Sequence, residues 1–206
     1  MKNSLNIGFV GLTHLGLNYL AATSEKGFKV FAIDLSKDKI NKLKKFHLEY
    51  DEPNLKRMIY KNKKRIFFSS DLNNLKYCNI IFVSQDVKTS KKGKGDLKSL
   101  KKLITKISKF INKKSVLVIL SQVQPGFTRI VNFEKSRLYY QVETLVFGRA
   151  LERALKPERI IIGCEDAESK INHFFLKYLN NFNCPIIKMK YESAELTKIS
   201  INILLA

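Results

Sequence analysis

The chain has few cysteines, no long apolar segment and almost no sequence before its first predicted strand. Its three cysteines, Cys78, Cys164 and Cys184, lack paired spacing, so we expect neither a disulfide framework nor a metal site. No run of about 18 apolar residues occurs, which argues against a membrane-spanning helix. Residues 1–4 are too short a leader for a cleaved signal peptide, so we expect a cytoplasmic protein with no membrane partner.

Acidic residues are also scarce, with 18 Asp and Glu against 38 Lys and Arg and a formal net charge of +20. A basic surface attracts polyanions by releasing their counterions, and it would also attract a small anionic ligand. However, the sequence has no recognisable nucleic-acid-binding motif, and its lysines fall mostly on predicted helix surfaces and loops. We therefore expect a solvated lysine-rich surface and no nucleic-acid partner, and keep polyanion binding as a third hypothesis. The lysine clusters are Lys42–Lys45, Lys61–Lys64, Lys88–Lys101 and Lys113–Lys114.

Predicted strands and helices alternate along the whole chain, which is typical of a sheet with helices on both faces. An apolar content of 45% in 206 residues suits a large domain with a packed core. Apolar residues at helical spacing predict helices that include residues 97–111, 166–180 and 192–206. We therefore predict an α/β fold with a doubly wound, mostly parallel, Rossmann-like sheet. The predicted strands are Leu5–Val10, Val30–Ile33, Ile66–Phe68, Asn79–Val83, Ser115–Leu120, Leu138–Val142, Arg159–Ile162 and Pro185–Met189.

A glycine-containing turn, Gly11–Gly16, joins the first predicted strand to a helix, and the next strand ends in an acid, Asp34. Such a unit places backbone N–H groups and a helix N-terminus where they suit a pyrophosphate, and its acid can accept hydrogen bonds from a ribose. It predicts a dinucleotide site, although an ordinary β-α-β turn with tightly packed glycines would have the same pattern. The candidate cofactor-binding residues of this unit are Gly11, Thr13, His14, Leu15, Gly16 and Asp34.

Polar residues follow two later strands and recur on the last predicted helix. Residues 121–126 form a turn after a buried strand, at the edge where open α/β sheets bind ligands. Lys198 and Asn202 would share a helix face, where they could stabilise negative charge on a substrate oxygen. Glu143, at the end of a strand, could act as a general base. The alternatives are an exposed polar stripe for the helix residues and, for Glu143, an ion pair with a nearby arginine such as Arg149 or Arg153.

Several segments occur in the same order as in one enzyme family. They are the glycine turn with Asp34, followed by residues 52–55, 86–89, 121–128, 143–148 and 194–198 and by Asn202. Over essentially its whole length, the chain therefore resembles the nucleotide-sugar dehydrogenases of the UDP-glucose and GDP-mannose dehydrogenase type. The resemblance implies NAD as cofactor and a nucleotide sugar as substrate, whose C6 alcohol is oxidised to a carboxylate in nucleotide-sugar metabolism and polysaccharide biosynthesis. UDP-glucose, a UDP-N-acetyl sugar and GDP-mannose all remain open as substrates.

The resemblance also implies roles for particular residues. Thr89, Ser121 and Gln122 would line the nicotinamide end of the cofactor site. Glu143 would assist the attack of water on a covalent intermediate, and Lys198 with Asn202 would hold the oxyanion on the substrate. The chain departs from the family pattern at five positions, which are Thr13 for the second glycine, Lys88 for Pro, Gln122 for Thr, Val142 for Pro and Phe147 for a second Glu.

The resemblance divides the chain into a dinucleotide-binding domain, residues 1–190, and the start of a central dimerisation helix, residues 191–206. Family members continue into a second domain that carries the catalytic cysteine and most nucleotide contacts, and we expect this substrate domain to be absent here. The chain would then be either a part-enzyme that needs a partner chain or a truncated, non-catalytic NAD-binding module. The apolar terminal helix would mediate a homo-oligomer or the contact with that partner chain.

Overall fold

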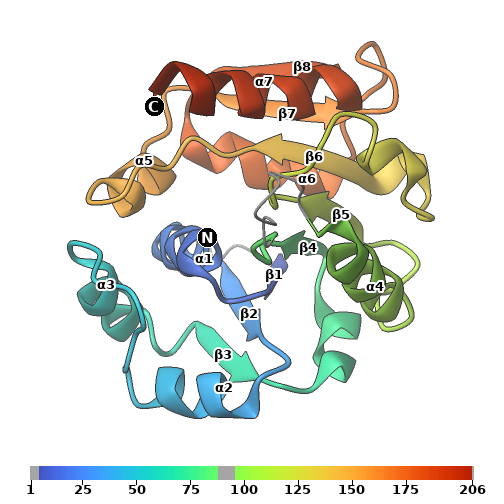
Figure 1. The fold of residues 1–206 in the computed structure, drawn as a ribbon. Helices are drawn as coiled ribbons and strands as arrows, with labels where there is room; N and C mark the ends of the chain where they lie inside the picture. The colour runs from blue at the N-terminus through green and yellow to red at the C-terminus, as the bar shows by residue number, and fades with distance from the viewer. Residues whose placement is uncertain (1–4, 88–95, 206) are drawn as a thin grey trace.

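The computed structural model describes residues 5–87 and 96–205, and its centre is an eight-stranded sheet (Figure 1). The strand order is β3-β2-β1-β4-β5-β6-β7-β8. All neighbouring pairs run parallel except β6 and β7, which run antiparallel. The predicted doubly wound, mostly parallel sheet is thus confirmed. The strands are β1 Asn6–Val10, β2 Lys29–Ile33, β3 Ile66–Ser69, β4 Ile80–Val83, β5 Val116–Ile119, β6 Leu138–Val142, β7 Ile160–Cys164 and β8 Ile186–Lys190.

The chain winds outward from β1 in two directions. Strands β2 and β3 lie on one side of β1, and β4 to β8 follow on the other side. The connections that leave the neighbouring strands β1 and β4 therefore run in opposite directions. In open α/β sheets such a point leaves a crevice at the carboxyl ends of the strands, where ligands bind.

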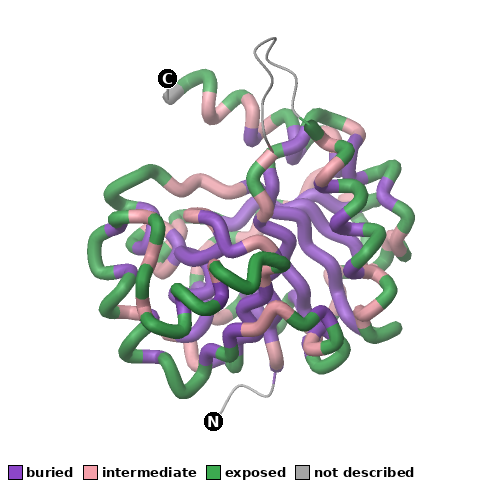
Figure 2. The backbone as a smooth tube through the Cα atoms, turned by 60° about the horizontal axis from the view of Figure 1, so that its bottom comes forward, coloured by how far each residue is buried: buried purple, intermediate pink, exposed green. Residues whose placement is uncertain are grey.

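Helices cover both faces of the sheet, and each face has its own apolar core. One core joins the sheet to α1, α2, α3, α5 and α6, and the other joins the opposite face to η1, α4 and α7. In Figure 2 the buried strands form the centre of the molecule and exposed segments surround them. The α-helices are α1 His14–Glu25, α2 Lys37–Lys44, α3 Leu55–Lys61, α4 Leu97–Ser108, α5 Ala150–Leu155, α6 His173–Leu179 and α7 Tyr191–Leu205. The 3-10 helices are η1 Leu72–Tyr77, η2 Thr128–Ile130, η3 Lys135–Arg137 and η4 Asn180–Phe182.

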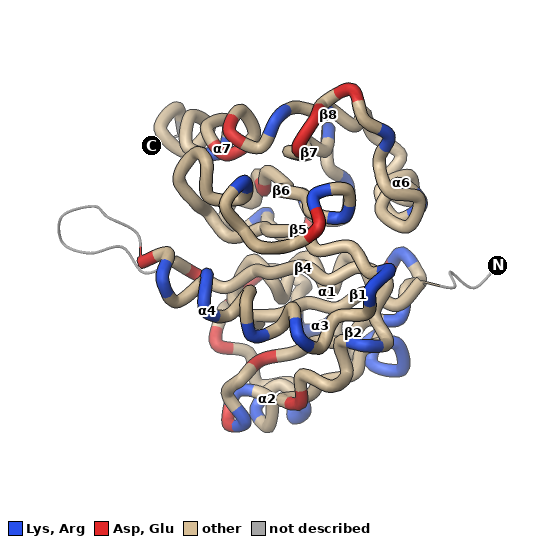
Figure 3. The backbone as a smooth tube through the Cα atoms, turned by 90° about the vertical axis from the view of Figure 1, so that its right-hand side faces the viewer, with Lys and Arg blue, Asp and Glu red and all other residues tan. Residues whose placement is uncertain are grey.

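Residue patterning explains the central strands and helix α4. Every residue of β4 and β5 is buried, as expected for parallel strands that are covered on both faces. Helix α4 is amphipathic instead, with four buried apolar residues on one side and exposed lysines on the other. Figure 3 shows basic residues along α4 and also on α2. This arrangement fits the solvated lysine-rich surface predicted from composition.

Helix α6 is shorter than predicted, because it begins at His173 and not near residue 166. Asp166 forms a turn of its own, in which its carboxylate accepts a hydrogen bond from Glu168 N (3.1 Å) and its carbonyl accepts one from Ser169 N (3.2 Å). Asn172 then caps the helix by accepting a hydrogen bond from Phe174 N (3.0 Å). Local bonds from Asp and Asn side chains compete with helix formation, which explains the later start.

Helix α7 is buried at its beginning and exposed at its end. Tyr191 and Ala194 belong to one of the two cores, whereas Ile203 and Leu204 are 70% and 84% exposed. The end of the helix projects from the rest of the chain in Figure 2. No helix within the described ranges is long and apolar enough to cross a membrane. The predicted division of the chain at residue 190 stays a prediction.

Candidate functional site

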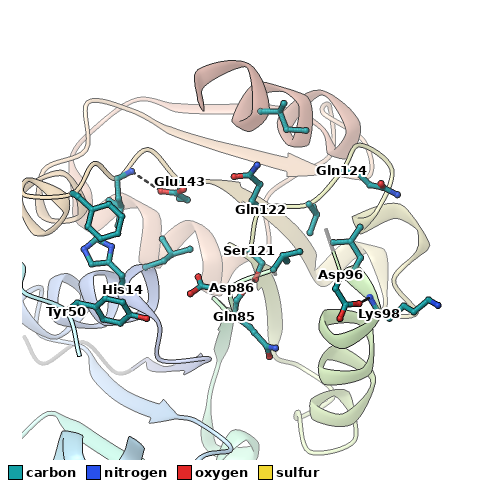
Figure 4. A pocket seen from close by; sticks show the side chains of 17 residues that line it. His14, Tyr50, Gln85, Asp86, Asp96, Lys98, Ser121, Gln122, Gln124 and Glu143 are labelled. Carbon is teal, nitrogen blue, oxygen red and sulfur yellow. Dashed lines mark hydrogen bonds between the residues drawn. The ribbon is translucent and has the colours of Figure 1, made fainter. Parts of the chain in front are cut away.

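A cavity of about 1050 Å³ opens at the carboxyl ends of β1, β4, β5 and β6 (Figure 4). It therefore lies at the sheet edge where the sequence predicted a ligand site. Its lining combines the first turn of α1, the segment after β4, the turn after β5 and the loop after β6. The candidate residues that line it are His14, Leu15, Ser121, Gln122 and Glu143.

The two glycines of the first turn are required by close packing. Gly11 has a φ of +89°, and a Cβ there would lie 2.8 Å from Gln85 N. At Gly16 a Cβ would lie 2.4 Å from Gly11 O and 2.5 Å from Ser84 Oγ. Residues 84 and 85, which follow β4, therefore approach the turn too closely for a side chain at either position. This packing is equally compatible with the cofactor interpretation and with an ordinary β-α-β turn.

Thr13, which replaces the second glycine of the pattern, caps helix α1. Its hydroxyl donates to Ser84 O (2.7 Å) and accepts from Gly16 N (3.4 Å), and its carbonyl accepts from Leu17 N (2.9 Å). Its φ of −80° is accessible to any residue, so the turn needs no glycine here. The amides of His14 and Leu15 have no partner inside the helix. Helix α1 thus keeps an N-terminus that fits an anion such as a pyrophosphate.

Asp34 lies immediately after β2, against the glycine turn. Its Oδ2 accepts a hydrogen bond from Leu12 N (3.0 Å), and its Oδ1 accepts one from Ser36 N (3.0 Å). Lys39 Nζ lies 3.7 Å from Oδ2. The carboxylate is thereby fixed beside the turn with lone pairs left to accept hydrogen bonds from ribose hydroxyls, so its position fits the predicted cofactor role.

The residues predicted to act on the substrate form a continuous chain of contacts. Lys198 forms an ion pair with Glu143 and donates a hydrogen bond to Asn202 Oδ1 (2.9 Å). Asn202 Nδ2 in turn donates to Gln122 Oε1 (2.8 Å). Lys198 is 3% exposed, so the interpretation as an exposed polar stripe is wrong for this residue.

The ion pair of Glu143 is therefore made with a lysine from α7 and not with a nearby arginine. Arg149 pairs with Glu152 at 3.0 Å, and Arg153 donates a hydrogen bond to Thr144 O at 3.3 Å. The second oxygen of Glu143 accepts a hydrogen bond from Leu145 N (2.9 Å). The carboxylate is thus held on both sides at the lining of the cavity.

Two other predicted residues have different outcomes. Ser121 Oγ donates to Gln85 O (2.6 Å), so its proton is engaged with the segment after β4, although the residue lines the cavity. Thr89 lies outside the described residues.

Asp86, which belongs to the same family segment as Thr89, lines the cavity. Burial raises the pKa of its carboxyl despite the opposing effects of Lys39, His14 and Thr13. A carboxyl perturbed in this way inside a cavity is a candidate functional group.

Glu52, to which the sequence assigned no role, joins two sides of the site. Its Oε2 contacts His14 Nε2 (2.8 Å) and accepts from Gly148 N (3.1 Å), and its Oε1 accepts from Ala150 N (2.8 Å). Burial acts to raise the pKa of Glu52, but the hydrogen bonds from His14, Gly148 and Ala150 together lower it below the usual value. The carboxylate therefore fastens the loop after β6 to the first turn of α1.

Glu195, on α7, has a comparable function at the turn after β5. It is fully buried, and it accepts hydrogen bonds from Gly126 N (2.6 Å) and Thr128 N (2.7 Å). Burial raises the pKa of the Glu195 carboxyl, and the contacts with Thr128 and Gly126 oppose this rise. The resemblance included residues 194–198 as a motif, and that motif was the only signal in the sequence that could have found this residue.

Comparison with known proteins adds independent information. Residues 5–179 match the model of the UDP-glucose/GDP-mannose dehydrogenase family, NAD binding domain. UDP-glucose 6-dehydrogenase TuaD of Bacillus subtilis is 29% identical over 97% of this chain and 46% of its own length. UDP-glucose 6-dehydrogenase of Rickettsia bellii is 30% identical over 98% of this chain and 49% of its own length. The chain thus spans about half the length of these curated relatives.

Solved structures show the same likeness. GDP-mannose dehydrogenase from Pseudomonas aeruginosa has a TM-score of 0.87 at 21% identity, over 100% of this chain and 50% of that one. UDP-glucose dehydrogenase from Pyrobaculum islandicum also has a TM-score of 0.87, at 22% identity, over 99% of this chain and 50% of that one. At this level of identity the likeness establishes the fold alone.

Proposed function

Because the chain belongs to the UDP-glucose/GDP-mannose dehydrogenase family, whose NAD-binding domain it contains, we propose that it is the NAD-binding portion of a nucleotide-sugar 6-dehydrogenase. In this proposal it takes part in oxidising the C6 alcohol of a UDP- or GDP-sugar to the uronate. The supporting observation is the chain of contacts from Glu143 through Lys198 and Asn202 to Gln122, beside the cavity at the sheet edge.

The glycine turn and Asp34 are suited to hold the cofactor. NAD, when bound, accepts a hydride from the carbon that is oxidised. The amides at the start of α1 suit its pyrophosphate, and Asp34 suits the hydroxyls of its adenosine ribose. A carboxylate at this position also repels a 2′-phosphate, which favours NAD over NADP.

Lys198 and Asn202 are suited to stabilise negative charge that develops on a substrate oxygen. The ammonium group of Lys198 is buried and already oriented by its contacts with Glu143 and Asn202, so little reorganisation is needed when a ligand binds. Glu143 is suited to accept a proton, because its carboxylate lines the cavity and is fixed by Lys198 and Leu145 N.

A second candidate is a non-catalytic NAD-binding module, and the cysteines favour it. Full oxidation to the acid needs a thiolate that traps the aldehyde. Among the described residues, no cysteine lines the cavity, and burial raises the pKa of Cys78, Cys164 and Cys184 alike. A partner chain that supplied a reactive thiol would restore the first candidate.

Calorimetric titration with NAD⁺ tests the cofactor role directly. We expect saturable binding to the wild-type chain and roughly tenfold to hundredfold weaker binding to Asp34→Ala, because charge-assisted hydrogen bonds to the ribose are lost. The matched control is Asp38→Ala, a change at an exposed carboxylate on α2 that pairs with Lys42, and it should bind NAD⁺ like the wild type.

The absence of saturable binding at millimolar NAD⁺, or equal affinity in Asp34→Ala, would refute the cofactor assignment. Turnover separates the two candidates once binding is established. Formation of reduced nicotinamide with UDP-glucose, a UDP-N-acetyl sugar or GDP-mannose supports the enzyme, and binding without turnover supports the non-catalytic module.

A further inference from the structure

Three aromatic rings lie together on β2, β3 and η1, apart from the candidate site. Phe31, on β2, contacts Phe67 of β3 and Tyr77 of η1, with ring centroids 5.7 Å and 6.3 Å apart. Phe31 is buried, whereas Phe67 and Tyr77 are 48% and 54% exposed. None of the three lines the cavity at the carboxyl ends of the strands. These three rings, the aromatic patch, therefore have no part in the roles given above.

The aromatic patch exists because the core on the η1 side of the sheet ends at β3. Ile66 and Phe68 belong to the core on the other side, so Phe67 between them must point to the η1 side. Among the described strands, β3 is the outermost and pairs with β2 alone (Figure 1). Two exposed rings that share one buried ring differ from the singly scattered apolar residues of an ordinary surface, and they indicate an interaction site.

Two exposed lysines give the aromatic patch a positive charge. Lys29 Nζ lies 5.2 Å from the centre of the patch ring on β2, and Lys76 Nζ lies 5.0 Å from that of the ring on η1. Neither lysine forms an ion pair with a carboxylate of residues 5–87 or 96–205. Asp71, which caps η1, has its carboxylate engaged by the backbone amide and the side chain of Asn73. Both ammonium groups can therefore contact an anion.

The charge of the chain and the length of β3 decide which occupant fits the aromatic patch. A second copy would bring another formal charge of +20 to a surface that is itself basic, so repulsion disfavours self-association there. A peptide that added a further strand would need a long free edge, but β3 has four residues, and short edge strands resist such pairing. A single strand of nucleic acid fits better, because bases stack on exposed rings and phosphates pair with lysines.

We propose that the aromatic patch, together with Lys29 and Lys76, binds single-stranded nucleic acid. Phe67 and Tyr77 each stack on a base, and the two lysines contact phosphates of the same strand. The rings select single strands, because a duplex keeps its bases stacked inside the helix. This gives the polyanion hypothesis, drawn from the composition of the chain, a definite location outside the candidate site.

Fluorescence anisotropy of a labelled oligothymidylate of about ten nucleotides, titrated with the full chain, tests this assignment. We expect Phe67→Ala and Tyr77→Ala each to weaken binding about fivefold to hundredfold, because stacking on one ring is lost. Tyr77→Phe keeps the ring and should bind like the wild type. Lys29→Ala and Lys76→Ala should each reduce the slope of log affinity against log salt concentration by about 0.7.

Matched controls separate the aromatic patch from the general positive charge of the chain. Tyr60→Ala removes a 55% exposed ring on α3 that also has a lysine, Lys63, 4.3 Å from its centre. Lys101→Ala removes an exposed lysine on α4. Both variants should bind the oligonucleotide about as tightly as the wild type. Heparin, a polyanion without bases, should bind the wild type and the aromatic variants equally.

A second readout retains all three rings, and it is possible because the chain contains no tryptophan. Phe67→Trp introduces a single indole into the aromatic patch. The oligonucleotide should quench its emission by stacking on it, whereas heparin and a duplex of the same sequence should not.

The proposal is overturned if the oligonucleotide does not bind, or if Phe67→Ala and Tyr77→Ala bind it as tightly as the wild type. Equal weakening by Tyr60→Ala would also overturn it, since any exposed ring would then serve. Displacement of the oligonucleotide by NAD⁺ would place the strand in the cavity and not on the patch. Quenching of the Phe67→Trp indole by polyglutamate, but not by the oligonucleotide, would assign the patch to an acidic protein instead.

Discussion

Replacing Glu52 should disturb both stability and the candidate site, because one buried carboxylate receives contacts from three groups. Glu52→Ala removes the acceptor for His14 and for the amides of Gly148 and Ala150. The bond from Ala150 N is itself buried, so that amide would lose its partner away from water. An unsatisfied buried donor costs about 1–3 kcal/mol, and with the two other lost bonds we expect about 2–4 kcal/mol of lost stability.

Glu52→Gln should cost less, about 1–2 kcal/mol, because its amide keeps one oxygen that can accept hydrogen bonds. Urea denaturation followed by circular dichroism measures both free energies of unfolding. For a domain of this size, each kcal/mol corresponds to about 2–4 °C in the melting temperature.

The pH dependence provides an independent check on the same carboxylate. The pKa of Glu52 is lowered in the folded state from its usual value of 4.5. Its contribution is therefore fully present above pH 4.5 and is lost as the pH falls through the folded-state pKa. The difference in stability between wild type and Glu52→Gln should shrink in this acidic range, which denaturation at several pH values will measure.

The matched control for Glu52 is Glu152→Ala. Glu152 is an exposed carboxylate on α5 that pairs with Arg149 in the same loop region, so its loss should leave stability close to that of the wild type. Equal destabilisation by Glu52→Ala and Glu152→Ala would refute the idea that Glu52 fastens this loop.

Two further predictions concern other buried features. Gly16→Ala should destabilise the chain by about 1–3 kcal/mol, because the new Cβ would overlap Gly11 O. In Gly126→Ala the new Cβ meets no atom within 4 Å, so this variant should cost only about 1 kcal/mol, through the φ of +92° at that position. Urea denaturation of the two variants compares their free energies of unfolding. Glu195 should show the opposite pH behaviour to Glu52. Its pKa is raised, so its contribution is present below pH 4.5 and is lost as the pH rises through the folded-state pKa. The stability of wild type relative to Glu195→Gln should therefore fall from acidic towards neutral pH, and unchanged relative stability would contradict the raised pKa.

Periodicity was sufficient to predict the sheet but not every helix boundary. The apolar runs that became β4 and β5 are buried on both faces, so their composition alone carries the signal. The start of α6 could not be predicted in the same way. The turn at Asp166 and the cap at Asn172 depend on side-chain hydrogen bonds that do not alter the apolar spacing.

The candidate site was predictable where local geometry determines it. Spacing alone placed Lys198 and Asn202 on one helix face, and they do contact each other. The partner of Glu143 was not predictable, because Lys198 reaches it from a distant segment of the chain. The role of Glu52 was missed for the same reason, since Gly148 and Ala150 approach it only in the folded chain.

Helix α7 determines the geometry of two loops at once. Glu195 binds the amides of Gly126 and Thr128, Lys198 binds Glu143, and Asn202 binds Gln122. The three helix residues are spaced by three and then four positions, which places them on one face. A change that moved α7 without altering these residues would therefore move the turn after β5 and Glu143 together. The helix is thus a structural part of the cavity and not merely an appendage to the sheet.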